Sequence, residues 1–517
     1  MNLVIEFLLA VALGALHGVP VSFPSLWALQ PLALAWLFWR VDQATPQRAA
    51  WLGWLFGCSW LVSSVWWLFI SMHFYGDLPA WAAAGAVWAL CAALSLYLAL
   101  AMGLFARWRR GRFGADAALI TALWLLAELA RCLILTGFPW AASGYAHVDS
   151  PLAFLAPWLG VYGVGACAAG GVAMLVFQRS VAIPLRTRCL AVGALLGAVL
   201  LASRWVPHEF TQPAGEVSVA LLQNNVPQEQ KFSPDHLGHA LEWTRDKLMT
   251  LPVDLVVAPE TVVPLLPADV PDDFWEPLRS YFASPGRHAI VGLPLGDFEK
   301  GFTNSAAGLS SQTLAMPEGF YRYDKHHLVP FGEFIPTGFR WFTNLMGIPL
   351  GDFRRGPLQA PSFRVETAAS VQWVAPNICY EDLFGEELAA RFIEPQPPTI
   401  LANLSNMAWF GNTIAIRQHL QISRMRSLEL QRPMIRATNT GATALIDHQG
   451  HVSSQLPAYT TGVLAGLVQG REGITPFAWW AGRWGLWPLL ALGVLMVVVS
   501  RRWGHTGTGS VGVAAAG

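Results

Sequence analysis

Long apolar stretches separated by short polar loops fill the first 205 residues, and one more follows near the C-terminus. A helix that crosses the hydrocarbon core of a membrane needs about 20 apolar residues. The first stretch lacks the basic start and the small-residue cleavage site of a signal peptide, so we expect it to be retained as a helix. The pattern predicts eight transmembrane helices, at 3–19, 22–40, 50–71, 80–105, 117–136, 153–178, 189–205 and 483–500.

The residues between the seventh and eighth stretches show a different pattern. Polar residues return, and no run is long enough to cross a membrane. Alternating strands and helices are expected here, which is typical of an α/β domain. Short apolar runs bounded by turn-forming residues predict buried strands at 217–226, 254–259, 288–294, 371–377 and 399–406. The expected helices are 381–393 and 417–432, the second with an apolar face through Leu420, Ile422, Met425 and Leu428.

Arginines in the short loops predict the orientation in the membrane. The loops after spans 1, 3 and 5 contain no Lys or Arg. Because Lys and Arg near helix ends stay on the cytoplasmic side, we expect both termini in the cytoplasm and the α/β domain outside it, which in a bacterium is the periplasmic side of the inner membrane. The arginines on the opposite side are Arg40, Arg48, Arg107, Arg109, Arg110, Arg112, Arg179, Arg186, Arg188, Arg501 and Arg502.

The chain is therefore expected to have four parts. The first is a seven-span membrane domain at 1–210, and the second is the α/β domain at 211–475. An eighth transmembrane helix follows at 476–503, before a small-residue tail at 504–517 that we expect to be disordered. Composition agrees with a membrane protein: 54% of the residues are hydrophobic and 13% are charged. The net charge of zero gives no electrostatic reason to expect nucleic acid as a partner.

One cysteine stands apart from the rest. Of six cysteines, Cys379 alone falls in the predicted external domain, so it has no partner there for a disulfide. It lies between a predicted strand and a predicted helix, as nucleophiles do in many α/β enzymes. A helix N-terminus favours an anion, so a lowered thiol pKa is expected. A buried, inert cysteine is the alternative.

A thiol nucleophile needs a base and a donor for the oxyanion that forms after attack on a carbonyl. Glu260 follows a predicted strand, at the end where α/β folds build their sites. Lys325 lies 65 residues later, and Cys379 another 54 residues on. Each residue alone is weak evidence, because Glu at strand ends and Lys in loops are commonly structural. The three residues in this order along the chain are more specific evidence for a catalytic site than any one of them alone.

At these residues the chain resembles the nitrilase superfamily, whose members use a Glu–Lys–Cys triad. It resembles in particular the membrane-embedded branch, the apolipoprotein N-acyltransferases, over essentially the whole chain. The helical frame and the segment LTGFPW at 135–140 match as well. The motifs that carry this resemblance are APETVVP, YDKHHLVPFGEFIP, PNICYEDLFG, NLSNMAWFG and RMRSLELQRPMIRATNTGATALID.

The resemblance implies an α-β-β-α sandwich and a two-step acyl transfer. An acyl chain, usually the sn-1 chain of phosphatidylethanolamine, would move to Cys379 as a thioester and release a lysophospholipid. The N-terminal α-amine of a diacylglyceryl-cysteine apolipoprotein would then take the acyl chain. No metal and no organic cofactor are implied.

The family's site residues carry over to positions in this chain. Glu260 would be the general base, and Lys325 would face the oxyanion together with the N–H after Cys379. Glu333 would hold the lysine, although a loop salt bridge is the alternative. Tyr380 and Glu381 match positions that matter for activity, and Glu381 is also a good helix-capping residue.

Other positions concern substrate contacts and departures from the family. The resemblance implies that Phe232 and Trp409 face substrate, but the family often has tryptophan at position 232. It also often has aspartate where this chain has Met407. His326 and His327 are expected to pack or to form hydrogen bonds, since further metal ligands at suitable spacing are lacking.

Two charges stand inside a predicted span. Glu128 and Arg131 are three residues apart on one helical face, where they are expected to pair. A role at the active-site mouth and a structural ion pair both remain open for them.

Two other function classes remain in competition. A membrane-tethered amidase or nitrilase would hand the same thioester to water. A non-enzymatic transporter or scaffold is the third possibility, which the presence of all three triad residues disfavours.

Overall fold

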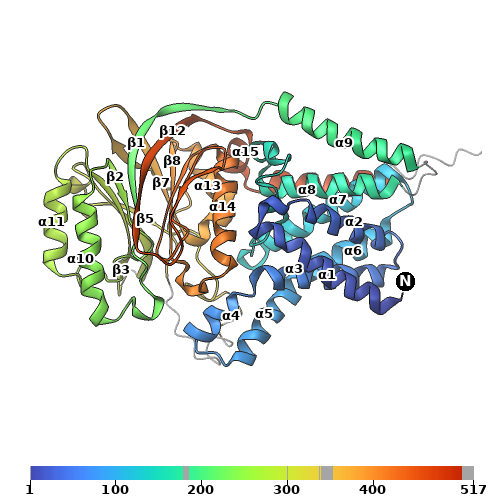
Figure 1. The fold of residues 1–517 in the computed structure, drawn as a ribbon, viewed down its shortest axis with the longest axis horizontal. Helices are drawn as coiled ribbons and strands as arrows, with labels where there is room; N and C mark the ends of the chain where they lie inside the picture. Colours follow the sequence, from blue (N-terminus) through green and yellow to red (C-terminus); the bar gives the residue numbers. More distant parts are fainter. Residues whose placement is uncertain are drawn as a thin grey trace, which may run out of the picture.

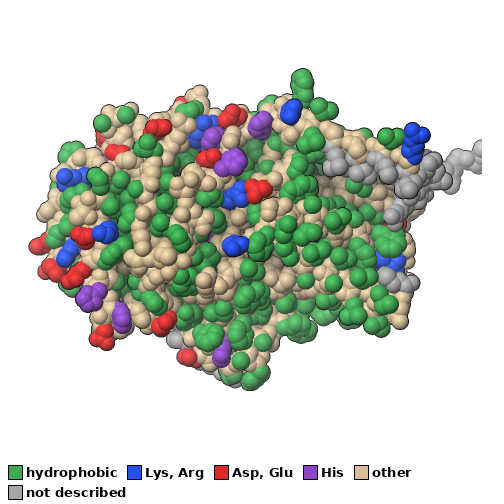
Figure 2. All heavy atoms as spheres, viewed as in Figure 1, with side chains coloured by type: hydrophobic (Ala, Val, Ile, Leu, Met, Phe, Trp, Pro, Cys, Tyr) green, Lys and Arg blue, Asp and Glu red, His purple; other side chains and the backbone are tan. Residues whose placement is uncertain are grey.

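The computed structural model describes residues 2–178, 185–299, 301–336, 338, 340 and 353–502. The expected tail at 504–517 and Arg179 lie outside these residues. An α/β part and a helical part lie side by side (Figure 1). Apolar side chains cover the surface of the helical part, and most of the charged side chains visible in this view lie on the α/β part (Figure 2).

The helical part is built from the N-terminal half of the chain and its C-terminal end. Many of its large apolar side chains face outward; Trp81 is 80% exposed and Leu100 is 62% exposed. Such a surface fits contact with lipid rather than water. Its main helices are α1 (Leu3–Ser22), α2 (Leu29–Val41), α3 (Pro46–Val65), α4 (Leu68–Ile70), α5 (Ala80–Leu94), α6 (Leu96–Trp108), α7 (Phe113–Leu133), α8 (Ala156–Phe177), α9 (Leu185–Trp205), α15 (Pro476–Trp484) and α16 (Trp487–Arg502).

Fewer helices qualify as membrane spans than the eight that the sequence predicts. Among the described residues, four helices are long and apolar enough to cross a membrane, or up to six if each bent pair counts as one span. The bent pairs join α3 to Leu68–Tyr75 at 63° and α15 to α16 at 92°. In place of the expected span at 22–40, the chain forms α2, which has only 13 residues. Eight spans are therefore not confirmed.

The α/β part contains two sheets of six strands each. All five strands predicted from the sequence are present, as β1, β2, β3, β7 and β8. The first sheet has the order β12 (Gly462–Gly473), β1 (Thr211–Gln223), β2 (Leu255–Val257), β3 (His288–Asp297), β4 (Gly301–Leu309), β5 (Tyr321–Asp324). The second has the order β11 (Val452–Gln455), β10 (Ala444–Ile446), β9 (Met434–Thr438), β8 (Ile400–Ser405), β7 (Val371–Ile378), β6 (Phe363–Glu366).

Alternating side chains of the strands place the sheets face to face. Val219 and Leu221 of β1 join the core between the sheets, which also holds Ile378 and Leu404 of the second sheet. The intervening Ala220 points the other way, as the two-residue period of a strand requires. There it joins a second cluster with helices α10 (Pro234–Thr250) and α11 (Asp272–Phe282). With α14 (Ile414–Leu430) on the far side, the domain is an α-β-β-α sandwich, as expected (Figure 1).

Two helix predictions need correction. The segment 381–393 does not form one helix but three short pieces: a 3₁₀ turn at Cys379–Leu383, α13 (Gly385–Ala389) and a second 3₁₀ turn at Ala390–Ile393. Helix α14 forms where expected, but it has no solvent-facing side opposite an apolar stripe. Most of its polar side chains are buried too, because it lies between the second sheet and the membrane helices.

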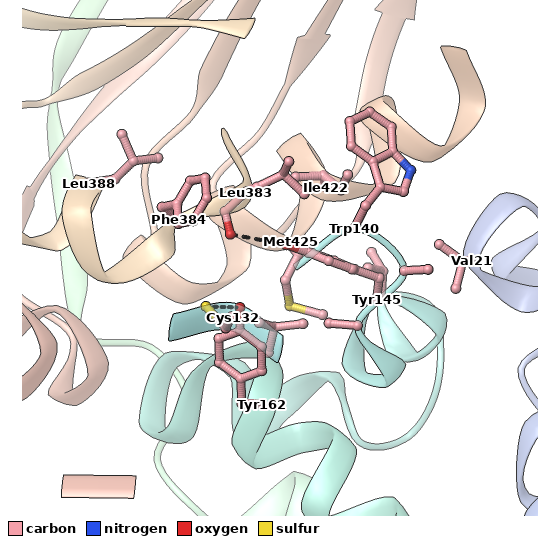
Figure 3. Packing of buried hydrophobic residues seen from close by; sticks show 14 of the residues in the cluster. Val21, Cys132, Trp140, Tyr145, Tyr162, Leu383, Phe384, Leu388, Ile422 and Met425 are labelled. Carbon is pink, nitrogen blue, oxygen red and sulfur yellow. Dashed lines mark hydrogen bonds between the residues drawn. The ribbon is translucent and has the colours of Figure 1, made fainter. Parts of the chain in front are cut away.

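A continuous apolar cluster joins the two parts around α14. Ile422 and Met425 of α14 lie with Trp140 and Tyr145 of the loop that follows α7 (Figure 3). The Tyr145 hydroxyl donates a hydrogen bond to the carbonyl of Leu383, 3.4 Å away. The α/β part is thus packed onto the helical part through α14.

Candidate active site

Glu260 lies just beyond strand β2, at the end of the first sheet. Its carboxylate accepts hydrogen bonds from the side-chain amide of Asn304 at 2.7 Å and from the backbone N–H of Asn406 at 2.8 Å. The backbone turns sharply here, since Thr261 has φ +49°. Gly292 permits this turn, because a Cβ at that position would lie 2.4 Å from the carbonyl oxygen of Pro259. The carboxylate is therefore held in one orientation.

Lys325 follows strand β5 directly and is almost completely buried, at 1% exposure. Its backbone N–H donates to the carbonyl of Asn304 at 2.8 Å. Its Nζ lies 2.9 Å from Glu333 Oε1 and 3.5 Å from Glu260 Oε1. Burial lowers the pKa of the ammonium, but the negative charges of Glu333 and Glu260 together raise it by more than burial lowers it. The pKa of Lys325 therefore lies above the ordinary value. Lys325 is a fixed positive charge.

Glu333 contacts more than the lysine. Its Oε1 also accepts from the Asn304 side chain at 2.8 Å, and its Oε2 accepts from the backbone N–H of Val329 at 2.8 Å. Asn304 therefore bridges Glu333 and Glu260, and all four groups form one hydrogen-bonded cluster. A simple loop salt bridge does not describe this arrangement.

Cys379 begins the turn after strand β7 with a left-handed backbone, φ +51°. Such a conformation is strained for a residue other than glycine and is common where a nucleophile is presented. The thiol is half-buried and its pKa responds to the charges of Glu260 and Lys325. The structure thus brings the three triad candidates to one end of the sandwich.

The expected lowering of the Cys379 pKa is wrong. Burial raises the pKa of the thiol to about 12; Glu260 adds to the increase, whereas Lys325 opposes it. The turn after Cys379 is a 3₁₀ turn of five residues, so the dipole of a full helix is not available to favour a thiolate. The resting group is a neutral thiol, and its reaction requires a base.

Glu381 ties the nucleophile's turn to the lysine's strand. Its carboxylate accepts from the backbone N–H groups of Ile378 and His326, both at 2.6 Å, and from the Tyr323 hydroxyl at 2.8 Å. The first of these bonds is the capping contact expected from sequence, and the other two reach another part of the chain. The neighbouring Tyr380 hydroxyl donates to the carbonyl of Gly137 in the helical part, 3.2 Å away.

The two residues expected to face substrate lie at the surface of the α/β part. Phe232 is 62% exposed and Trp409 is 38% exposed. The Trp409 ring packs edge-on against Tyr75, with centroids 5.6 Å apart. Tyr75 ends the bent segment that follows α3, so Trp409 lies where the α/β part meets the helical part.

Met407, where the family often has aspartate, is fully buried. Its sulfur lies 3.2 Å from Nδ1 of His419 on α14. Arg436 also contacts that nitrogen, at 2.8 Å. The Met407 thioether therefore lies beside the hydrogen-bonded pair of His419 and Arg436.

Sequence reasoning did not single out Lys231, Asn304 or Asn406 as site residues. Lys231 is buried and donates to the carbonyl oxygen of Glu260 at 3.1 Å. Burial lowers the pKa of this lysine to about 8, against the attraction of Glu260 and Cys379. Their positions in the sequence could have indicated two of these residues: Lys231 precedes Phe232, which is expected to face substrate, and Asn406 lies in the family segment NLSNMAWFG.

Comparison with known proteins identifies the chain. Its residues 13–175 match the sequence model of the apolipoprotein N-acyltransferase N-terminal domain, and residues 218–473 match that of the carbon-nitrogen hydrolases. An apolipoprotein N-acyltransferase from Verminephrobacter eiseniae is 50% identical over 505 residues, covering 92% of each chain. One from Ralstonia nicotianae is 48% identical over 503 residues, covering 95% of this chain and 92% of the relative. The chain belongs to the apolipoprotein N-acyltransferase family.

Among solved structures, the carbon-nitrogen hydrolase from Helicobacter pylori G27 is similar to a part of this chain. It is 16% identical and covers 53% of this chain and 94% of its own, with a TM-score of 0.34.

The buried charges of this N-terminal domain form an ion pair, as expected. Arg131 lies 3.4 Å from Glu128, and it donates to the carbonyl of Trp140 at 3.3 Å. Glu128 accepts from both the backbone N–H and the hydroxyl of Ser143, at 2.8 and 2.7 Å. The pair therefore fastens the loop after α7 to that helix.

The two histidines of the lysine segment make hydrogen bonds, as expected. His326 Nδ1 lies 2.8 Å from the carbonyl of Gly356. His327 Nδ1 lies 2.9 Å from Glu387, and its ring stacks on Phe384 with centroids 3.5 Å apart. Across the described ranges, His, Cys, Asp and Glu form no group of three or more that could hold a metal ion.

Proposed function

We propose that this family member moves an acyl chain from a phospholipid to the N-terminal α-amine of a diacylglyceryl apolipoprotein, through a thioester on Cys379. The observation that carries the proposal is the cluster of Glu260, Lys325 and Glu333 beside Cys379 in a chain of this family. The names of the curated relatives supply the acceptor class. Phosphatidylethanolamine is the proposed donor.

In the first step, the Cys379 sulfur attacks the ester carbonyl of the phospholipid while Glu260 takes the thiol proton. The resulting oxyanion faces the Lys325 ammonium and the backbone N–H of Tyr380. The carbon–oxygen bond then breaks, and the leaving lysophospholipid oxygen takes the proton from Glu260. The acyl group is left on sulfur as a thioester.

In the second step, the α-amine of the apolipoprotein attacks the thioester carbonyl. Glu260 takes a proton from the amine, and the same donors stabilise the second oxyanion. The carbon–sulfur bond breaks, and the Cys379 sulfur regains the proton from Glu260. Donor and acceptor thus use one site in turn, which is a ping-pong mechanism.

The packing of the site on the helical part supports access from the bilayer. Tyr380 is bonded to Gly137, and Trp409 contacts Tyr75 of the bent segment after α3. The first contact joins the residue after Cys379 to the helical part, and the second joins the segment that follows β8 to it. A lipid chain reaching Cys379 from the membrane needs a site at this junction, whereas a hydrolase needs open access to water.

The test uses purified protein in detergent–phospholipid micelles. With labelled phosphatidylethanolamine alone, the protein should form a hydroxylamine-sensitive acyl adduct, and Cys379→Ser should form none. Adding a diacylated lipopeptide should move the label to its α-amine. An adduct that persists in Cys379→Ser contradicts the thioester, and free fatty acid as the main product would favour the hydrolase alternative.

We further propose that residues 211–475 lie on the periplasmic side of the bacterial inner membrane, with both termini in the cytoplasm. A membrane-impermeant thiol reagent added to intact cells should label a cysteine introduced at Phe298, which is 93% exposed in the α/β part. A cysteine introduced at the exposed Arg110 should stay unlabelled until the cells are broken. The opposite pattern would reverse the orientation.

A further inference from the structure

Two adjacent residues of helix α14 connect the membrane helices with the nucleophile. Gln418 is fully buried, and its carbonyl oxygen accepts from the indole N–H groups of Trp67 at 3.1 Å and Trp140 at 2.8 Å. Its amide donates to the Ser22 hydroxyl at 3.1 Å and to the Ser64 carbonyl at 2.9 Å. A side-chain amide has two donors and two acceptor sites, so all four are used. Every partner belongs to the helical part.

His419, the next residue, turns toward the active site. Its Nε2 lies 3.1 Å from the carbonyl oxygen of Cys379. Its Nδ1 lies 2.8 Å from the guanidinium of Arg436, which can only donate. Nδ1 is therefore the acceptor, and Nε2 carries the proton that is donated to Cys379.

The carbonyl of Cys379 belongs to the peptide group that also contains the Tyr380 N–H. Because a peptide group is planar, fixing the carbonyl at one end fixes the direction of the N–H at the other. That N–H stands at the start of the 3₁₀ turn, where backbone donors have no partner within a helix. It is the donor assigned above to the oxyanion. Cys379 has a left-handed φ, which is strained for a residue other than glycine. Contacts from outside the turn are therefore needed to keep this peptide group in place.

We propose that His419 is a positioning residue for the oxyanion donor, and that Gln418 makes its position depend on the membrane helices. The proposal rests on the function proposed for Cys379. One helix thus carries adjacent contacts to both parts: four hydrogen bonds to the helical part and one to the nucleophile's peptide. Ile422 and Met425 pack the next turns of the same helix against Trp140 and Tyr145 (Figure 3).

The first experiment compares two reactions of Cys379 in His419→Phe. Acylation by labelled phosphatidylethanolamine forms an oxyanion, so its rate constant should fall about 100-fold, as for the loss of one oxyanion donor. Alkylation by iodoacetamide forms no oxyanion, so its rate should stay within about threefold of wild type. His419→Gln, whose amide offers a donor at similar reach, should recover part of the acylation rate.

Equal losses in both reactions would overturn the positioning role, since they would mean a displaced or misfolded thiol. Wild-type acylation in His419→Phe would overturn it as well. The function proposed for Cys379 is tested separately: an adduct that persists in Cys379→Ser removes that function, whereas a normal adduct in His419→Phe removes only the positioning role.

The second experiment tests the link to the membrane helices. Gln418→Met keeps the size of the side chain and removes its hydrogen bonds, and we expect acylation to slow on the order of tenfold, with KM for the phospholipid unchanged. Ser22→Ala removes one of the four bonds from the membrane side and should slow acylation less. Arg417→Lys, at the exposed neighbouring position on α14, keeps a cation near the ring of Phe23 and is the matched control, which should match wild type.

The double variant Gln418→Met/His419→Phe decides whether the two residues act together. If Gln418 acts through His419, the double variant should be no slower than His419→Phe alone. Additive losses would overturn the coupling, as would wild-type acylation in Gln418→Met. If Gln418→Met does not fold, Ser22→Ala in the His419→Phe background replaces it in the same comparison, and additivity there has the same meaning.

Discussion

The Glu381 carboxylate accepts a hydrogen bond from the backbone N–H of His326 at 2.6 Å, and this contact joins the turn of Cys379 to the residue that follows Lys325. Glu381 also accepts from Ile378, immediately before the nucleophile, at 2.6 Å. One buried side chain therefore sets the distance between the segment that supplies the thiol and the segment that supplies the ammonium. Backbone donors around a carboxylate hold it firmly because charged hydrogen bonds are the stronger kind.

Glu381→Gln tests this relationship with little change in shape. An amide has one acceptor oxygen and turns its NH₂ group toward backbone donors, so at least one of these bonds is lost. We expect kcat to fall about 10- to 100-fold with KM nearly unchanged, since a small misplacement of catalytic groups has effects of this size. Glu366→Gln, on the exposed edge strand β6, is the matched control. A wild-type kcat in Glu381→Gln would show that Glu381 only caps the turn and does not position the catalytic groups.

Lys325→Met should nearly silence the first half-reaction. The methionine fills the volume but removes the charge that faces the oxyanion, and the loss of one such donor costs about 10²–10³ in rate. It also leaves Glu333 and Glu260 without the cation that lies 2.9 and 3.5 Å from them. A time course of acyl-adduct formation measures the effect. A rate within tenfold of wild type would remove Lys325 from the oxyanion site.

Lys231 predicts a pH dependence near neutrality. Because burial lowers its pKa to about 8, its charge beside Glu260 and Cys379 is lost as pH rises through that value, and acyl-adduct formation should decline there. Lys231→Met should be slower at pH 7 and should lack this inflection. An inflection near pH 8 that survives in Lys231→Met would assign it to another group.

The stability of the protein should change with pH for the same reason. The folded-state pKa of Lys231, about 8, lies below the ordinary 10.5, so the folded chain releases this proton at lower pH than the unfolded chain. The contribution of Lys231 to the free energy of unfolding therefore rises between about pH 8 and 10.5. Thermal melts of wild type and Lys231→Met across that range, in one detergent, measure the difference. A constant difference would contradict the shifted pKa.

Local patterns in the sequence were enough for five of the twelve described strands and for choosing three residues that the structure brings to one end of the sandwich. Five apolar runs formed five strands, and in the structure Glu260, Lys325 and Cys379 each follow the end of a strand, although the sequence indicated this only for Glu260 and Cys379. Helix breaks were harder, because the pieces of 381–393 are shaped by contacts such as those of Glu381 with a distant segment. The periodicity of apolar residues also could not predict that most polar side chains of α14 are buried. Gln418 and Arg426 look like surface residues until the membrane helices cover them.

Residues that act through backbone atoms left the weakest signal. The Lys231 ammonium donates to the backbone carbonyl of Glu260, and the backbone N–H of Asn406 donates to the Glu260 carboxylate; no motif reveals such contacts. The prediction of a lowered pKa for Cys379 failed for a related reason. Desolvation of the thiol depends on tertiary packing, and its effect on the pKa outweighs that of the local turn. The number of membrane spans stays a prediction, because hydropathy does not reveal short or bent helices such as α2 and α15.

The Glu128–Arg131 pair makes the last prediction, because breaking it and removing it should have different results. Glu128→Ala leaves the buried Arg131 without its carboxylate and frees Ser143, and removing one partner of a buried pair costs about 3–5 kcal/mol. The double variant Glu128→Leu/Arg131→Met removes both charges and should recover much of that loss. Melts in detergent, followed by the iodoacetamide reaction of Cys379, separate membrane-domain stability from the active site. If Glu128→Ala melts like wild type yet loses acylation, the pair acts in catalysis rather than in holding the loop after α7.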